Sequence, residues 1–234
     1  MTAPSSMRFC MTVVRPSSWM MVTAASIVVA ATALCWTTPD GADQSAGLVL
    51  LYQIFAASTG YRDRAIRGHF DSLLGMMRDR RSLAYAHFCA SVAPGAALWL
   101  VIGILGLVSS RGHHQPAALT LPGVAALAIA SAVGWCFSLQ FGRYTGGACW
   151  MLALLSLASV HRLQALRDVL LDPGGSWTSI VARGGAASVC PLFLLAGPPV
   201  GAPVLAVVTA LAAGIVLAGV RVVDGMDVPL EDPR

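Results

Sequence analysis

Four long stretches with almost no charged residue constrain this chain more than any other feature. They run over residues 19–36, 84–108, 117–139 and 202–220. About 20 apolar residues are needed to cross a hydrocarbon layer roughly 30 Å thick. Each stretch is about that long, so the sequence predicts an all-α integral membrane protein.

The overall composition leads to the same prediction. Hydrophobic residues make up 56% of the 234 residues and charged residues only 11%. An ordinary soluble domain carries about 25% charged residues. The chain is long enough to fold as a soluble domain, but it has too little polar material to cover one with a hydrophilic surface.

The predicted architecture is one transmembrane domain over residues 1–234, a polytopic helical bundle of about six spans. The spans are expected at 18–37, 46–59, 84–108, 117–139, 148–160 and 202–221, and the second and fifth are short. Prolines interrupt residues 186–200, which can be a re-entrant element or a seventh span. Pro94-Gly95 and Pro122-Gly123 are expected to kink the third and fourth spans.

The arginines predict the orientation, because loops on the cytoplasmic side of a membrane are rich in arginine and lysine. With six spans and a cytoplasmic N-terminus, four of the 15 basic residues fall outside, namely Arg111, Arg162, Arg167 and Arg183, and the other eleven fall inside. Asp40 and Asp43 fall in an outer loop. Both termini are therefore predicted to be cytoplasmic, in the inner or plasma membrane of a bacterium.

The residues that are missing exclude several kinds of chemistry. All 15 basic residues are arginines, so the chain has no phosphate-binding loop lysine and no Schiff-base lysine. Six scattered cysteines form no C-x-x-C pair, and His113-His114 has no evident third ligand. We therefore expect no catalytic constellation, no metal, no cofactor and no nucleic-acid partner. His87, near the start of the third span, is expected to be packed or interfacial.

Residues 60–83, between the second and third predicted spans, combine an apolar stripe with basic charge. The stripe consists of Ile66, Phe70, Leu73, Leu74 and Met77, which recur at helical spacing, and the segment closes with Arg78-Asp79-Arg80-Arg81. An amphipathic basic helix of this kind lies in the cytoplasmic interface of a membrane. It can be an ordinary positively charged loop or a docking surface for a partner.

The same segment resembles a family. Gly68-His69-Phe70-Asp71-Ser72-Leu73-Leu74, followed by Arg80, is similar to the G-T-L-E-x-L-L-x-x-P-V-S-R segment of ABC type 2 permeases. In that family the segment is the coupling helix, which joins spans two and three and docks on the ATPase subunit. Met77-Arg78-Asp79 replaces the Pro-Val-Ser part, and Ile66-Arg67 replaces the acidic residue that usually precedes the glycine.

The resemblance implies the membrane subunit of an exporter, a homo- or heterodimer of permeases driven by a separate ATP-binding cassette subunit. The residues expected to contact that partner are Arg67, Gly68, Asp71, Leu74, Arg78, Arg80 and Arg81. The alternative is a scaffold or assembly protein that does not transport and whose basic helix binds anionic lipid. Lipid attraction of this kind is worth about 1 kcal/mol for each arginine near the surface.

Overall fold

The computed structural model describes residues 18–38, 41–58, 80–109, 115–140, 160–172, 175–196 and 200–225, and within these ranges every regular element is a helix. The all-helical prediction is confirmed. Four helices are long and apolar enough to cross a membrane: Met20–Thr37, Arg80–Ser109, Leu121–Leu139 and Ala202–Gly225. These four helices indicate a helical membrane protein, while the count of six spans stays a prediction.

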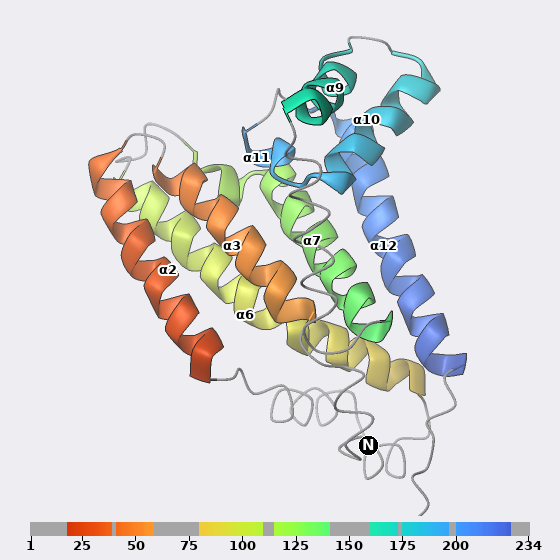
Figure 1. The fold of residues 1–234 in the computed structure, drawn as a ribbon, viewed down its shortest axis with the longest axis horizontal. Coiled ribbons are helices and arrows are strands. Elements are labelled where there is room, and N and C mark those ends of the chain that lie inside the picture. The colour runs from red at the N-terminus through yellow and green to blue at the C-terminus, as the bar shows by residue number, and fades with distance from the viewer. Residues whose placement is uncertain are drawn as a thin grey trace, which may run out of the picture.

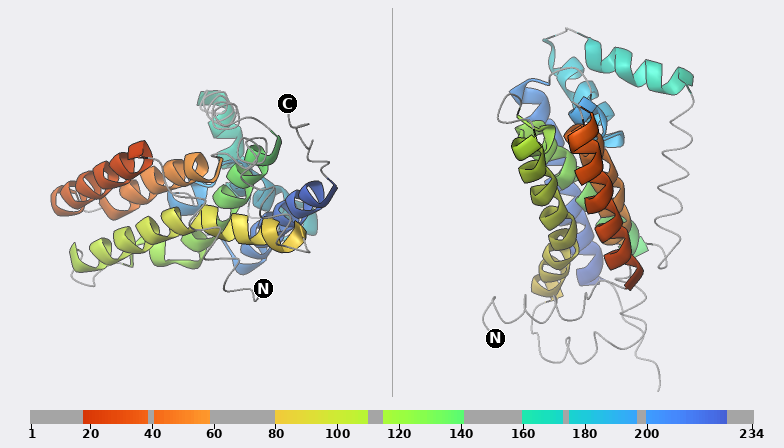
Figure 2. Two further views of the ribbon diagram at one scale, coloured as in Figure 1. Left: turned by 90° about the horizontal axis from the view of Figure 1, so that it is seen from below. Right: turned by 90° about the vertical axis from the view of Figure 1, so that its left-hand side faces the viewer.

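Five long helices lie side by side, and three shorter ones gather at one end of them (Figure 1). The long helices are α2 (Ser18–Thr37), α3 (Gly41–Ser58), α6 (Arg80–Ser109), α7 (Leu121–Gln140) and α12 (Ala202–Gly225). The shorter ones are α9 (Val160–Leu171), α10 (Trp177–Val189) and α11 (Phe193–Ala196), and a 3₁₀ turn, η1 (Ala117–Leu119), precedes α7. Figure 2 shows α9 lying across the direction of the long helices.

The bundle has two distinct ends. At the η1 end, α2 and α6 finish, α3 and α7 begin, and α9, α10 and α11 lie close by (Figure 1). At the arginine end, α3 and α7 finish, α6 begins and α12 finishes. Arg80, Arg81 and Arg221 belong to helix segments at the arginine end, whereas Arg167 and Arg183 belong to α9 and α10. The six-span prediction also separates Arg80, Arg81 and Arg221 from Arg167 and Arg183, and the side of the membrane that each end faces stays a prediction.

Helix α3 is longer than its apolar core suggests. It begins at Gly41 and has 18 residues, although the second span was expected only from residue 46. Asp43 lies in its first turn, so the prediction that Asp43 belongs to a loop is wrong. A tertiary contact explains the extension, because Asp43 Oδ1 accepts a hydrogen bond of 2.8 Å from the Ala117 backbone N–H. Gly41 also permits the tight α2–α3 turn, since a Cβ there would collide with the Leu34 carbonyl.

Three further boundaries differ from the sequence-based expectation. Helix α6 starts at Arg80, so Arg80 and Arg81 form the first turn of this long helix. Helix α12 continues to Gly225, which places Asp224 in its last turn and not in the polar tail. Pro122 lies in the first turn of α7, where a missing N–H costs no helical hydrogen bond, so it is not positioned to kink that helix. Pro94, in contrast, lies inside α6.

Two predicted features lie largely or wholly outside the described residues. They are most of the segment 60–83 and the fifth span at 148–160, of which only Val160 is described, as the first residue of α9. The predicted element 186–200 is described in part. Helix α10 ends at Val189, Cys190 donates its N–H to the Ala186 carbonyl, and α11 begins at Phe193. The helix is therefore interrupted next to Pro191, as the prolines of this element predict.

The buried apolar side chains form two separate cores. The large core draws on all the described helices and η1, and includes Val49, Leu98, Ile102, Ile129 and Val208. The small core lies at the arginine end and consists of Ala57, Leu83, Ala84, Ala90, Trp135, Leu139, Val220 and Val223. Helix α2 contributes to the large core only.

Candidate functional site

Of the seven predicted partner-contact residues, only the last two are described, and they lie at the start of α6. Arg67, Gly68, Asp71, Leu74 and Arg78 lie outside the described residues, and Arg80 and Arg81 are the first two residues of α6. Both arginines are exposed at the arginine end. The structure thus describes where this segment enters the bundle, but it brings only two of the seven predicted residues together.

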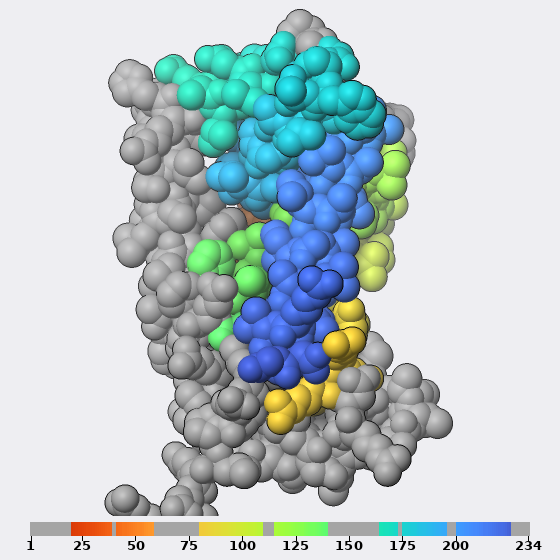
Figure 3. Space-filling view, turned by 90° about the vertical axis from the view of Figure 1, so that its right-hand side faces the viewer, coloured from red at the N-terminus to blue at the C-terminus, as the bar shows by residue number. Residues whose placement is uncertain are grey.

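Arg81 ties the start of α6 to the end of α12. Its Nε lies 2.9 Å from Asp224 Oδ2, and the pair joins positions 143 residues apart in the sequence. Figure 3 shows the end of α12 in blue beside the start of α6 in yellow. The side chain of Arg81 is 63% exposed and that of Asp224 36%, so solvent screens much of their attraction. The pair is therefore a positional link more than a source of stability.

Beneath this pair, Trp135 of α7 fills the small core. Its side chain is fully buried, and its Nε1–H donates a hydrogen bond of 3.1 Å to His87 Nδ1 on α6. The ring of Phe88 meets the ring of Trp135 edge-on, with centroids 5.4 Å apart. His87 is 1% exposed, which confirms the expectation of a packed histidine. Because Nδ1 accepts this hydrogen bond, it carries no proton itself.

Two glycines make room for this packing. A Cβ on Gly219 of α12 would collide with the ring of Trp135, and a Cβ on Gly134 of α7 would crowd the Ile54 carbonyl and Ala57 of α3. The backbones of α3, α7 and α12 can therefore approach closely, as small residues permit in membrane helices. The starts and ends of these helices form one tightly packed unit at the arginine end.

A buried amide of α3 lies among large-core residues, four residues before the small core begins at Ala57. Gln53 of α3 is fully buried, and its Nε2 donates to the Ser91 carbonyl of α6 (3.2 Å) and to Ser131 Oγ of α7 (3.0 Å). Its Oε1 is buried and has no hydrogen-bond partner among the described residues. We call Gln53, Ser91 and Ser131 the polar layer. A buried unsatisfied oxygen costs about 1–3 kcal/mol, so it calls for a physical reason.

Helix α6 is modified at the level of the polar layer. Pro94 has no N–H and therefore cannot bond the carbonyl of Ala90, four residues earlier. Gly95 follows, and a Cβ there would collide with the side-chain amide of Gln53. The amide of Gln53 thus packs against a proline-glycine step and bonds the carbonyl of Ser91, one turn before it. Three helices are joined here by polar contacts and not by apolar packing alone.

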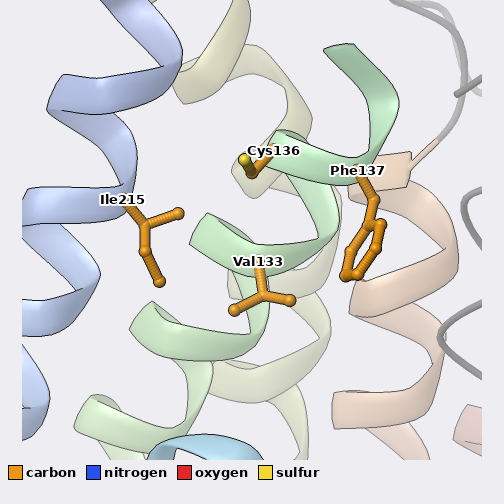
Figure 4. A pocket seen from close by; sticks show the side chains of 4 residues that line it. All are labelled: Val133, Cys136, Phe137 and Ile215. Atoms are coloured by element: carbon orange, nitrogen blue, oxygen red, sulfur yellow. The ribbon is translucent and has the colours of Figure 1, made fainter. Parts of the chain in front are cut away.

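Among the described residues, a small hollow lies between α7 and α12. Val133, Cys136 and Phe137 of α7 and Ile215 of α12 line it, and its volume is about 150 Å³ (Figure 4). Pockets for small molecules usually hold about 300–1,000 Å³ and carry a few polar groups that orient the ligand. This apolar hollow is too small and too uniform to define a substrate site.

The described cysteines and acidic residues contribute no metal site. Within the described ranges, no group of three or more His, Cys, Asp or Glu side chains could hold a metal ion. Cys35, Cys89, Cys136 and Cys190 are all free thiols. Burial raises the pKa of the Cys190 thiol, against a smaller opposite effect of the Leu192 and Phe193 N–H groups. Cys190 is therefore kept as an uncharged thiol that packs as a small apolar residue.

Sequence reasoning missed three residues that matter in this arrangement. Gln53 could have been recognised as a buried polar residue, because it is the one amide in the otherwise apolar stretch from 46 to 57. Trp135 gave no signal, since nothing in the sequence relates it to His87, 48 residues away. Asp224 was assigned to a polar tail, and only the packing of α12 on α6 and α7 reveals its role.

Comparisons with models of protein families, with curated proteins and with solved structures find no match for this chain.

Proposed function

We propose that this protein is the membrane-spanning subunit of an ABC-type exporter, driven by a separate ATP-binding subunit that docks on residues 60–83. The observation that carries the proposal is the resemblance of Gly68–Arg81 to the coupling helix of ABC type 2 permeases. This segment joins α3 to α6, which is the position that the coupling helix occupies in those permeases.

The link between Arg81 and α12 supports the proposal. A partner that pushes on the segment before α6 acts on Arg81, whose side chain is bonded to Asp224 in the last turn of α12. The same force reaches α7 through Trp135, which packs against Gly219 and bonds His87. Movement at the docking segment would therefore be shared by α6, α7 and α12.

The composition supports a motor on a different chain. With no lysine in 234 residues, the chain cannot form the lysine-containing loop that holds the β- and γ-phosphates of ATP. The excess of arginine on the predicted inner side supports the cytoplasmic placement of both termini and of the docking segment. An exporter of this kind would work as a dimer in the inner or plasma membrane.

The charge of the arginine end also supports the second candidate, a scaffold that holds anionic lipid. Arg80 and Arg81 are exposed and close a segment that contains four more arginines. Lipid attraction is long-ranged and additive, so each lost arginine should weaken it by a similar step, and salt should weaken it overall. Docking on a folded partner depends instead on the shape of a few residues.

Affinity capture from gently solubilised native membranes tests the two candidates. The tagged chain is compared with Gly68→Ala and Leu74→Ala, with Leu217→Ala as the matched control, because Leu217 is an exposed leucine of α12 (53%) outside the docking segment. The exporter predicts an ATP-binding cassette protein in a fixed ratio to the chain. That protein should be lost at least tenfold from the two docking variants and kept by the control.

Two other results would count against the exporter. Recovery of the chain with no ATPase under several mild detergents contradicts the exporter. Binding of the purified chain to anionic vesicles that falls step by step with each arginine removed, and is unchanged in Leu74→Ala, favours the scaffold.

A further inference from the structure

The polar layer lies close to the boundary between the two cores on α6 and α7, whereas on α3 the large core continues past Gln53 to Ala56. On α6 the small core ends at Ala90 and the large core begins at Leu98, with Ser91, Pro94 and Gly95 between them. On α7 the large core ends at Ala132 and the small core begins at Trp135. On α12 the change falls between Ala212 and Val220. On α6 the stretch between the two cores therefore holds a polar contact and a proline-glycine step in place of buried apolar side chains.

The hydrogen bonds of the polar layer can rearrange more easily than apolar packing can. Dense apolar packing resists small displacements, because each displacement opens a gap. A hydrogen bond between side chains can be exchanged for another, and the fully buried Gln53 has a free acceptor, Oε1, among the described residues. Pro94 has already removed one backbone bond of α6, and Gly95 adds conformational freedom beside it. Kinks and hinges in long helices occur at such steps.

We propose that the polar layer is a hinge, about which the small core, with the start of α6 and the ends of α7 and α12, moves as one body relative to α2 and the large core. Gln53 is the positioning residue of this hinge. Its amide holds α6 to α7 in the described state, and its free oxygen allows it to exchange partners as α6 bends. The inference concerns the bundle itself and holds whatever partner binds the arginine end.

The contacts define which parts move together. Below the layer, the Arg81–Asp224 pair joins α6 to α12, the Trp135–His87 bond joins α7 to α6, and Gly219 brings α12 against Trp135. Helix α2 takes part in none of these contacts, and its buried residues belong to the large core. The start of α2 is therefore a fixed reference point against which movement of the arginine end can be measured.

Distance measurements between spin labels test the hinge in the full-length chain in lipid nanodiscs. All six native cysteines are first replaced by alanine. One label pair is placed at Met21 of α2 and Val222 of α12, which are 60% and 41% exposed. A control pair is placed at Trp36 and Leu121, at the η1 end, which are 70% and 77% exposed. We expect a broad or two-peaked distance distribution for Met21–Val222 and a narrow one for the control pair.

Two substitutions should change the first distribution in opposite directions. Pro94→Ala restores the backbone donor within α6 and should narrow the Met21–Val222 distribution by at least half. Gln53→Leu removes the bonds to Ser91 and Ser131 and should widen it. Pro122→Ala is the matched control, because Pro122 lies in the first turn of α7, and it should change neither distribution. The control pair should stay narrow in all three variants.

Two results would overturn the hinge. One is an equally narrow Met21–Val222 distribution in the parent protein and in Pro94→Ala. The other is equal broadening of both label pairs in Gln53→Leu, which would mean general loosening of the bundle. Since the measurement uses no partner, loss of the ATPase in the capture experiment and loss of the hinge in this one are independent results.

Discussion

The two ends of the bundle are held in different ways. At the η1 end, buried or half-buried hydrogen bonds fix backbone atoms: Asp43 accepts the N–H of Ala117, and Trp99 Nε1 donates to the Ala118 carbonyl at 2.6 Å. Thr120 then accepts the N–H of Gly123 and caps α7. At the arginine end, a small core and an exposed ion pair join the helices.

This difference indicates which end is fixed and which can respond. Hydrogen bonds to backbone atoms specify position and are costly to break when they are shielded from water. An exposed ion pair is worth little and adapts its geometry easily. The η1 end is therefore built to stay in place, and the arginine end is built to follow what binds there. Four sets of substitutions test this contrast, in order of expected effect.

The largest effect is expected from emptying the small core. Trp135→Ala removes a fully buried ring and should lower the free energy of unfolding by about 3–5 kcal/mol, because the surrounding helices cannot close the cavity. Trp135→Phe keeps an aromatic ring but loses the bond to His87 and part of the indole volume, so it should cost less. Thermal unfolding of the purified protein in detergent compares the two. Equal stability of Trp135→Ala and the parent would mean that the small core does not hold the arginine end.

Overpacking the same core should have the next largest effect. Gly219→Ala places a Cβ against the ring of Trp135 and should cost about 1–3 kcal/mol. Gly214→Ala is the matched control on the same helix, because a Cβ there meets nothing within 4 Å. The control should be neutral or slightly stabilising, since alanine favours a helix more than glycine does. A similar loss in both variants would show that contact with Trp135 does not decide the result.

Breaking the η1 end should cost about 1–2 kcal/mol. Asp43→Ala leaves the backbone N–H of Ala117 without its acceptor at a half-buried position. Asp168→Ala, at an exposed site of α9, should change the stability by less than about 0.5 kcal/mol. Amide hydrogen exchange at Ala117 measures the effect locally, and its rate should rise only in the Asp43 variant. No change there would contradict the account of the fixed end.

The smallest effect on stability is expected at the Arg81–Asp224 pair. A double-mutant cycle with Arg81→Ala and Asp224→Ala should give a coupling below about 1 kcal/mol, and high salt should reduce it. If the pair transmits movement from a docked partner to α12, these variants should reduce the activity that the partner stimulates far more than they reduce the free energy of unfolding. Exchange of the charges, Arg81→Asp with Asp224→Arg, should restore part of that activity. A coupling of several kcal/mol would mean that the arginine end is as fixed as the η1 end.

Much of the fold could be predicted from the sequence, because long apolar runs report helices directly. The run 18–37 coincides with α2, and the other three long runs fall within α6, η1–α7 and α12. The extent of α3 could not be predicted, since its first turn is polar and is held by the contact of Asp43 with Ala117. Local composition cannot reveal a helix end that is fixed by a residue 74 positions away.

The candidate site was less predictable for a similar reason. Arg80 and Arg81 stood out as the end of a charged cluster, which is a local pattern. Their link to Asp224 and the contact between Trp135 and Gly219 join residues 143 and 84 positions apart. Only the packed bundle brings such residues together, and a single sequence carries no record of it.

The buried amide of α3 has a consequence for how the protein is made. The acceptors of Gln53 Nε2 lie on Ser91 and Ser131, 38 and 78 residues later in the chain. An amide with no partner is costly away from water, and the partners that remove this cost exist only once α6 and α7 have been made. At about 5–20 residues per second, the ribosome needs about 4–16 seconds to add those 78 residues. During that time the amide of Gln53 lacks its final partners, and the arrival of α7 supplies the last of them.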